Sequence, residues 1–238
     1  MESLTPACEG RLSLYRPALF AFVFALPVCG QSIHGGLKLG VPLTQYFETG
    51  ATGSLHGSAE YSAATRRYTF GVSGEWRLTD AFGFEVDALY HRMGYVGIVN
   101  YFDSANGNFS NSAIDVKGNS WDLPVMVKYR FGRVVRPYVA GGGVLRYVGP
   151  VRGLGEQTIG TLVTKTGTTS SLDTTQPSDL RKRLYPGLTV AGGIEIGRGR
   201  IRILPEFRYT RWTANISGAG GLLRFAPNQV EFLAGALF

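Results

Sequence analysis

Ionised side chains recur at alternate positions in several segments of this 238-residue chain. Alternate residues of an extended strand point to the same face, so the charges of each segment gather on one side. A buried charge is costly unless it has a partner, and the chemistry this set offers is therefore mutual ion pairing. We predict a paired ionic core formed by Lys38, Arg77, Glu85, Asp87, Lys128, Arg130, Glu195, Arg202, Glu206, Arg208 and Glu231.

Catalytic chemistry has little support in the sequence. A nucleophile or an activated water needs a base beside it, and the chain has three histidines. His34 and His56 lie in a terminal segment and an expected loop, and His91 is four strand residues from Asp87, about 13 Å away. Phosphate-binding loops, dinucleotide fingerprints and a Gly-x-Ser-x-Gly run are absent. We therefore predict that the protein is not an enzyme and has no catalytic residue, metal site or cofactor.

The ionised positions belong to segments in which apolar and polar residues alternate with a period of two, which is typical of strands. Such segments cover residues 33–41, 68–78, 82–91, 121–131, 137–148, 188–196, 201–209 and 228–238. The 33 glycines suit tight turns and close strands. Short turns join the segments at 79–81, 132–133 and 198–199, and the intervening connections are long: 42–67, 94–120, 149–184 and 213–227. Within the third of these, residues 164–171 are expected to be a mobile polar tract.

The alternation of short and long connections predicts a barrel, and the two faces decide its type. A soluble barrel keeps its apolar face inside, whereas a membrane barrel shows that face to lipid. Eight strands leave room inside only for side chains, so the charged faces point inward and pair. Aromatic residues also form two expected bands at the strand ends, as at membrane interfaces. They are Tyr68, Tyr90, Trp121, Tyr147 and Trp212 toward the long connections, and Phe82, Phe131 and Phe238 toward the short turns.

Two turns predict specific strand pairs. If Arg198 and Gly199 form a two-residue hairpin turn, Glu195 lies opposite Arg202. If residues 80–82 form a three-residue turn, Arg77 faces Glu85. Both arrangements would place opposite charges across from each other, which stabilises a sheet.

The last segment, residues 228–238, alternates strictly and ends on Phe238. Together with the strand count and the stretch 137–143 after a short turn, it resembles the eight-stranded outer-membrane-protein β-barrel family of bacteria. That family includes the OmpA transmembrane domain, OmpX and the opacity adhesins, and the resemblance covers residues 33–238. The family often has an aromatic residue where Ala236 stands. The resemblance implies an all-β fold, an eight-stranded antiparallel up-and-down transmembrane β-barrel.

The same resemblance implies a location and a set of partners. The protein is expected in the outer membrane of a Gram-negative-type bacterium, with both mature termini in the periplasm and long extracellular loops. Phe238 would act as the assembly signal that the barrel-assembly machinery recognises on the C-terminal strand. The remaining expected partners are outer-membrane lipids, including lipopolysaccharide, and an unknown extracellular ligand.

The N-terminal segment predicts export. An apolar run over residues 18–26 follows Arg11 and Arg16, and it is shorter than the about 20 residues that span a bilayer. We interpret residues 1–30 as a cleavable signal peptide and residues 31–238 as the barrel domain. A buried N-terminal helix and a lipoprotein at Cys29 are the alternatives. Cleavage after Gly30 would remove both cysteines, Cys8 and Cys29.

The net charge of +7 favours anionic lipid headgroups over nucleic acid as the partner of an exported chain. The densest basic run, Arg181, Lys182 and Arg183, should lie near the outer rim, either in contact with lipopolysaccharide phosphates or as the solvated base of a loop. We predict a structural or surface-interaction role. A narrow porin for ions or small solutes is the first alternative, and a lipid A-modifying membrane enzyme is the second.

Overall fold

The computed structural model describes residues 32–64, 66–132, 135–163, 166–174, 183–197, 201–213, 217–218 and 223–238. The chain divides into two units, Met1–Gln31 and Ser32–Phe238. The predicted signal peptide, with both cysteines, therefore lies outside the described residues, as do Arg181 and Lys182. In the described part of the chain, no helix is long and apolar enough to cross a membrane.

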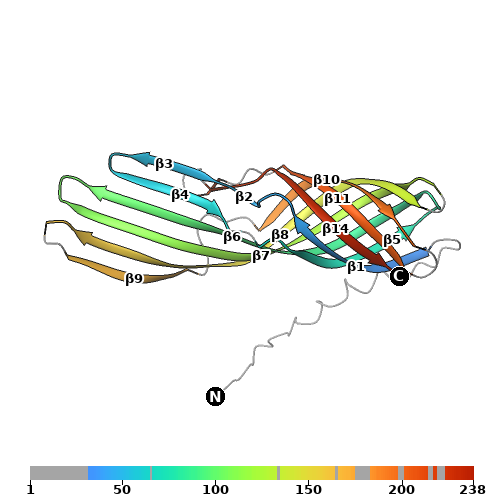
Figure 1. The fold of residues 1–238 in the computed structure, drawn as a ribbon, viewed down its shortest axis with the longest axis horizontal. Coiled ribbons are helices and arrows are strands. Elements are labelled where there is room, and N and C mark those ends of the chain that lie inside the picture. The colour runs from blue at the N-terminus through green and yellow to red at the C-terminus, as the bar shows by residue number, and fades with distance from the viewer. Residues whose placement is uncertain are drawn as a thin grey trace, which may run out of the picture. The chain divides into compact units, whose positions relative to one another are not determined.

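A closed ring of antiparallel strands forms the body of the second unit (Figure 1). In ring order, the strands are β1 (Ser32–Pro42), β5 (Thr69–Arg77), β6 (Phe82–Asp103), β7 (Asn108–Arg130), β8 (Arg136–Thr161), β10 (Leu184–Glu195), β11 (Arg202–Trp212) and β14 (Asn228–Leu237). Each strand pairs with the next, and β14 returns to β1 from Gly36↔Leu237 to Pro42↔Glu231. Such closure leaves no free strand edge within the ring. The predicted eight-stranded up-and-down barrel is confirmed.

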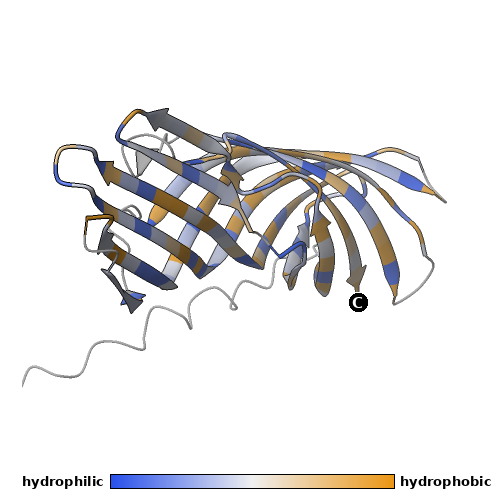
Figure 2. Ribbon diagram, turned by 60° about the vertical axis from the view of Figure 1, so that its left-hand side comes forward, coloured by the Kyte–Doolittle hydropathy of each residue, from blue (hydrophilic) through white to orange (hydrophobic). Residues whose placement is uncertain are grey.

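The two faces of the strands differ as the period of two predicts. Apolar side chains such as Leu37, Val125 and Val190 are exposed on the outer wall, whereas the neighbouring charged positions are buried. Figure 2 shows hydrophobic and hydrophilic residues alternating along the strands. In β8 the predicted facing is also correct, because Val139 and Leu145 are exposed. The barrel therefore has an apolar exterior and a polar interior.

Most of the predicted long loops are strands, so that prediction is wrong. β6 and β7 continue past the barrel as one hairpin up to Asp103↔Asn108, and β8 runs on to Thr161. The tract expected to be mobile is β9 (Thr166–Thr174) over its described residues, paired with β8. Beyond the ring both faces of this sheet meet solvent, so no apolar alternation marks the strands in the sequence.

We call this projecting part the extended sheet. It consists of β3 (Gly50–Ser54), β4 (Gly57–Ala63), the distal parts of β6, β7 and β8, and β9. β3 and β9 are its two edges, on the left of Figure 1. A separate small sheet contains β2 (Phe47–Glu48), β13 (Leu223–Phe225) and β12 (Ser217–Gly218). We call the barrel end that leads into these elements the mouth, and the opposite end the turn end.

Both predicted hairpin registers at the turn end are wrong. β5 and β6 pair through Arg77↔Gly83, so Glu75 faces Glu85. The reason is that the turn is centred one residue earlier, with Thr79 Oγ1 accepting a hydrogen bond from Phe82 N at 2.9 Å. In the other hairpin the ladder extends to Ile196↔Ile203. This places Glu195 two positions away from a direct pair with Arg202.

Glycine is required at two places that determine this geometry. Gly132 adopts a φ of 82° in the turn after β7, a conformation that other residues rarely take. A Cβ at Gly142 would lie 1.9 Å from the carbonyl oxygen of Val125, so β7 and β8 approach too closely there for any side chain.

Candidate functional site: the barrel interior

Charged side chains fill the interior of the ring in three groups. The turn-end cluster contains Glu75, Arg77, Arg130, Glu195 and Arg202. The central cluster contains Lys38, Glu85, Asp87, Lys128, Glu206 and Arg208. The mouth cluster contains Tyr46, His91, Asp122, Arg146, Gln229 and Glu231. Inward-facing positions of the ring strands supply every one of these residues except Tyr46, which follows β1.

The turn-end cluster is organised around Glu195 of β10. Arg77 Nη2 donates to both of its carboxylate oxygens, at 2.8 and 2.9 Å, and Arg130 Nε donates to one of them at 2.9 Å. Arg202 Nη1 lies 3.5 Å away and is half-buried. Arg77 thus contacts Glu195 and the nearby Glu75 instead of the predicted Glu85. The contact between Glu195 and Arg202 is present without direct strand pairing.

The central cluster is the most deeply buried of the three. Lys38 Nζ lies 2.5 Å from Glu85, 3.0 Å from Asp87 and 3.3 Å from Glu206. Arg208 Nη2 lies 2.6 Å from both Asp87 and Glu206. Lys128 contacts Glu85 as well.

Because each cation here touches two or more carboxylates, the ions compensate one another's lost hydration. The charged residues named in the three clusters include seven cations and seven carboxylates, with His91 in addition. Glu75 and Glu85, which face each other, are balanced by Lys128 between them, 3.4 Å from Glu75. A balance of this kind lets like charges pair across strands, which would otherwise be unfavourable.

Arg146 of β8 is the centre of the mouth cluster. Its Nε and Nη2 donate to the two oxygens of Asp122 at 2.7 Å each, and Nη2 also donates to Gln229 at 2.8 Å. The guanidinium carbon lies 4.1 Å from the ring centroid of Trp212 and 4.8 Å from that of Tyr46. The group is therefore held by a bidentate ion pair in its plane and by aromatic rings at its face.

His91 links the carboxylates of the mouth cluster. Its Nε2 lies 3.2 Å from Asp122, and its Nδ1 lies 3.3 Å from Glu231 and contacts the Tyr46 hydroxyl. From the sequence alone, His91 could be related only to Asp87 on the same strand. Its actual partners come from β5, β7, β14 and the segment after β1, and no local spacing encodes them.

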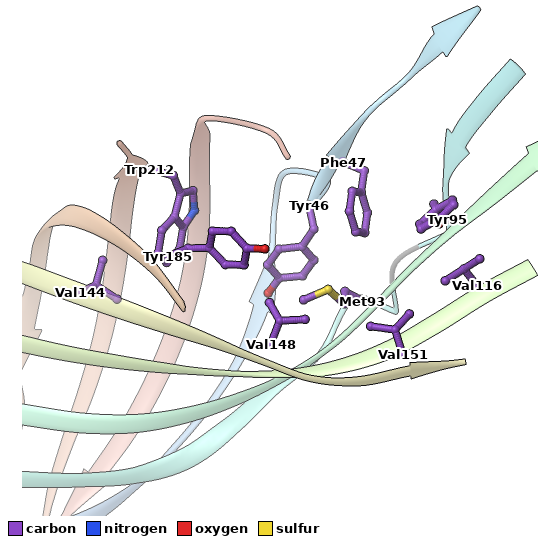
Figure 3. Packing of buried hydrophobic residues seen from close by; sticks show 10 residues of the cluster. All are labelled: Tyr46, Phe47, Met93, Tyr95, Val116, Val144, Val148, Val151, Tyr185 and Trp212. Carbon is purple, nitrogen blue, oxygen red and sulfur yellow. The ribbon is translucent and has the colours of Figure 1, made fainter. Parts of the chain in front are cut away.

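An apolar cluster closes the mouth above these ions. The chain turns inward after β1, and Tyr46 and Phe47 become almost fully buried. The phenyl ring of Phe47 packs on Phe225 of the small sheet with ring centroids 4.5 Å apart. Figure 3 shows the cluster: Tyr46, Phe47, Met93, Tyr95, Val116, Val144, Val148, Val151, Tyr185 and Trp212. We call it the apolar plug. Ion pairs and plug residues thus occupy the interior from the turn end to the mouth over the described residues.

The structure also places the remaining predicted residues. Trp212 is 6% exposed and points inward, so its assignment to the outer aromatic band is wrong; it shares a face with Arg208 and Thr210 of the same strand. Phe238 is 64% exposed, and its backbone pairs with Gly35. Arg183 is exposed, and its carbonyl accepts a hydrogen bond from Val148 N at 2.8 Å.

Four of the acidic, basic or histidine residues in the three clusters were absent from the predicted core: Glu75, Asp122, Arg146 and His91. All lie on the polar faces that the alternation identifies, and this was the only signal available for them. No group of three or more His, Cys, Asp or Glu side chains is placed to hold a metal ion within the described ranges.

Comparisons with known proteins find one matching family and a set of similar solved structures. The sequence profile of a family described as outer membrane protein beta-barrel domain matches residues 29–211. No match is found among curated proteins. Similar solved structures include Neisserial surface protein A, with 16% identity over 87% of this chain and 97% of that one, at a TM-score of 0.38.

Two further structures cover 87% of this chain. OprG of Pseudomonas aeruginosa is 13% identical, is covered over 95% of its length and has a TM-score of 0.43. Ail of Yersinia pestis, solved with the heparin analogue sucrose octasulfate, is 12% identical, is covered over 99% and has a TM-score of 0.36.

Proposed function

Because the chain belongs to the outer membrane protein β-barrel family, we propose that it is a closed barrel that acts through its cell-surface part and neither conducts solutes nor catalyses a reaction. Family membership puts the protein in the outer membrane of a Gram-negative-type bacterium. In this proposal the turn end and both mature termini face the periplasm. The extended sheet lies outside the cell.

The filled interior is the observation that carries the proposal. The cross-section holds paired ions from the turn-end cluster to the mouth cluster, and the apolar plug lies above them. An eight-stranded ring has little free diameter even when its interior side chains are small. A hydrated ion would have to separate several buried ion pairs to pass. In this proposal the interior side chains stabilise the barrel, and the outer surface binds the partners.

The extended sheet offers the surface for that interaction. Its hairpin tips are joined, because Phe102 N donates to His56 O and Leu162 N donates to Gly107 O, both at 2.8 Å. Next to these bonds Leu55 is 94% exposed and Val163 is also exposed. Leu55 also lines one surface pocket together with Tyr101, Phe109 and Leu162, and exposed apolar side chains grouped in this way are typical of contact surfaces. We propose that an extracellular ligand, still to be identified, binds here.

The proposed partners inside the envelope follow from the same placement. The apolar outer wall contacts outer-membrane lipids, lipopolysaccharide among them, and the terminal strand with Phe238 engages the barrel-assembly machinery. β14 pairs with both β1 and β11 and so closes the ring. Recognition of this strand by the assembly machinery would therefore act at the last step of closure.

Planar-bilayer recordings test the closed interior. We expect no steady current from the purified protein, because paired ions and the apolar plug occupy successive levels of the barrel. The double variant Tyr46→Ala/Phe47→Ala is the matched control: it shortens the apolar plug and leaves the turn-end and central clusters, so it should also not conduct. Steady nanosiemens currents from the natural chain would contradict the proposal and support the narrow porin.

Cysteine labelling on whole cells tests the sidedness. Removal of residues 1–30 as predicted would leave no natural cysteine, so each introduced thiol reports alone. A membrane-impermeant maleimide should label Leu55→Cys on intact cells, because this side chain projects from the extended sheet. Asp80→Cys, in the exposed turn between β5 and β6, should react only after the outer membrane is permeabilised. The opposite pattern would invert the proposed orientation.

A further inference from the structure

We infer that the outer wall of the barrel carries a binding site for the phosphorylated sugar headgroup of a glycolipid, in a cleft formed by Arg92, Lys117 and Arg152. The inference rests on the proposed function for the orientation of the barrel and names one membrane partner. The cleft is formed by β6, β7 and β8 where these strands leave the ring.

Aromatic residues fix the level of the cleft. Tyr90, Trp121 and Tyr147 are directly paired across the three strands and face outward, and the Tyr90 and Trp121 rings lie 5.4 Å apart. A row of this kind marks a membrane interface. The next outward position on β6 is Arg92, about 7 Å further along the strand. Headgroup phosphates therefore lie at the level of the cleft.

An irregularity in the β7–β8 ladder hollows the wall at this point. Gly118 pairs with Val151, whereas Ser120 pairs with Val148, so β8 has an extra residue there. Pro150 lies in this irregular stretch, where its missing N–H removes no ladder hydrogen bond. Past the bulge Arg152 faces outward beside Lys117, its direct partner on β7.

The cleft keeps positive charge available. Lys117 Nζ lies 2.5 Å from Asp115, and Arg152 donates to Asp173 through Nε and Nη2 at 3.2 and 2.7 Å. These hydrogen bonds hold the pKa of Asp173 below its usual value. Among the described residues, Arg92 has no acidic partner. The three cations exceed the two carboxylates by one positive charge, and the Nη1 group of Arg152 remains available as a donor. This combination suits a phosphate.

Two hydrogen-bonding groups of the cleft, one donor and one acceptor, point to a sugar next to the phosphate. The Tyr90 hydroxyl donates to Asn119 Oδ1 at 2.7 Å, which leaves the amide NH₂ of Asn119 as a free donor in the cleft. Asp115 Oδ1 is buried without a hydrogen-bond partner. A buried acceptor of this kind is costly unless a donor reaches it. A sugar hydroxyl beside the phosphate would supply that donor.

Binding of lipid A to the full barrel in detergent tests the site. The triple variant Arg92→Gln/Lys117→Gln/Arg152→Gln should bind bis-phosphorylated lipid A at least about tenfold more weakly, because three charge-assisted contacts are lost. The matched control Arg66→Gln/Arg67→Gln/Arg211→Gln removes the same charge from exposed positions elsewhere and should bind as the natural chain does. Equal affinity of the two triple variants would overturn the inference.

Two further probes separate a glycolipid headgroup from other phosphate sources. Asp115→Asn should weaken binding of lipid A but not that of phosphatidic acid, since only lipid A presents headgroup hydroxyls and release of Lys117 from its ion pair with Asp115 favours both anions. If inorganic phosphate at millimolar concentration displaces lipid A completely, the site is a simple anion site and the inference fails. The labelling of Leu55→Cys on whole cells tests the orientation of the barrel independently of lipid binding. If only the headgroup site is wrong, labelling succeeds and the lipid A test fails; if the proposed orientation is wrong, the labelling itself fails.

Discussion

Replacing Glu85 with alanine is expected to lower the free energy of unfolding by roughly 3–5 kcal/mol, the cost of leaving buried charges without their partner. Glu85 is 0% exposed and contacts Lys38, Lys128 and Arg208. Lys38 and Arg208 keep Asp87 as a partner, but Lys128 keeps only Glu75 at 3.4 Å. Urea titrations followed by the heat-modifiable shift on gels would measure the loss.

Two variants give this prediction its controls. Glu156→Ala removes an exposed carboxylate from the extended sheet and should change stability by about 0.5 kcal/mol or less. The double variant Glu85→Leu/Lys128→Leu removes one ion of each sign and should recover most of the loss, because buried pairs can often be replaced by apolar residues. If Glu85→Ala is as stable as Glu156→Ala, the central cluster does not stabilise the barrel.

The second large effect is expected at Arg146. Arg146→Ala should cost roughly 3–5 kcal/mol, because Asp122 would remain buried without its bidentate partner. Arg146→Lys keeps the charge and should still cost about 1.5–3 kcal/mol, since a lysine cannot make the paired hydrogen bonds or present a planar face to Trp212. The same titrations measure both losses.

The comparison with a surface arginine completes this test. Arg211 is exposed on the outer wall of the same barrel, one residue before Trp212. Arg211→Lys should leave the unfolding midpoint unchanged. A lysine at position 146 that is tolerated as well as one at position 211 would show that charge alone, without guanidinium geometry, matters in the mouth cluster.

The sequence predicted correctly those strands whose two faces meet different environments. Along β11 and β14 one face meets an apolar surrounding and the other meets buried ions, so the period of two is strong and the facing was predicted correctly. The extended sheet has solvent on both sides, and its Ser, Thr and Gly residues resemble a loop in the sequence. That is why β9 was predicted to be mobile.

The interior was predicted less completely than the fold. Alternation gives the face of a residue but not its neighbour across the ring, because that neighbour depends on a register that one turn residue can shift. Glu85 was therefore assigned to Arg77, although its contacts come from β1, β7 and β11. His91 and Tyr46 meet only because the segment after β1 turns inward, and no periodic pattern describes that turn.

The three clusters contain equal numbers of positive and negative ions, and this balance determines where the net charge of the protein lies. Their charges cancel, so residues elsewhere carry the excess of +7. Dissolved salt reaches those outer residues and weakens their field over about 10 Å at 0.1 M. It does not reach the enclosed pairs. Ionic strength should thus govern how strongly the protein attracts anionic surfaces while leaving its folded state almost untouched.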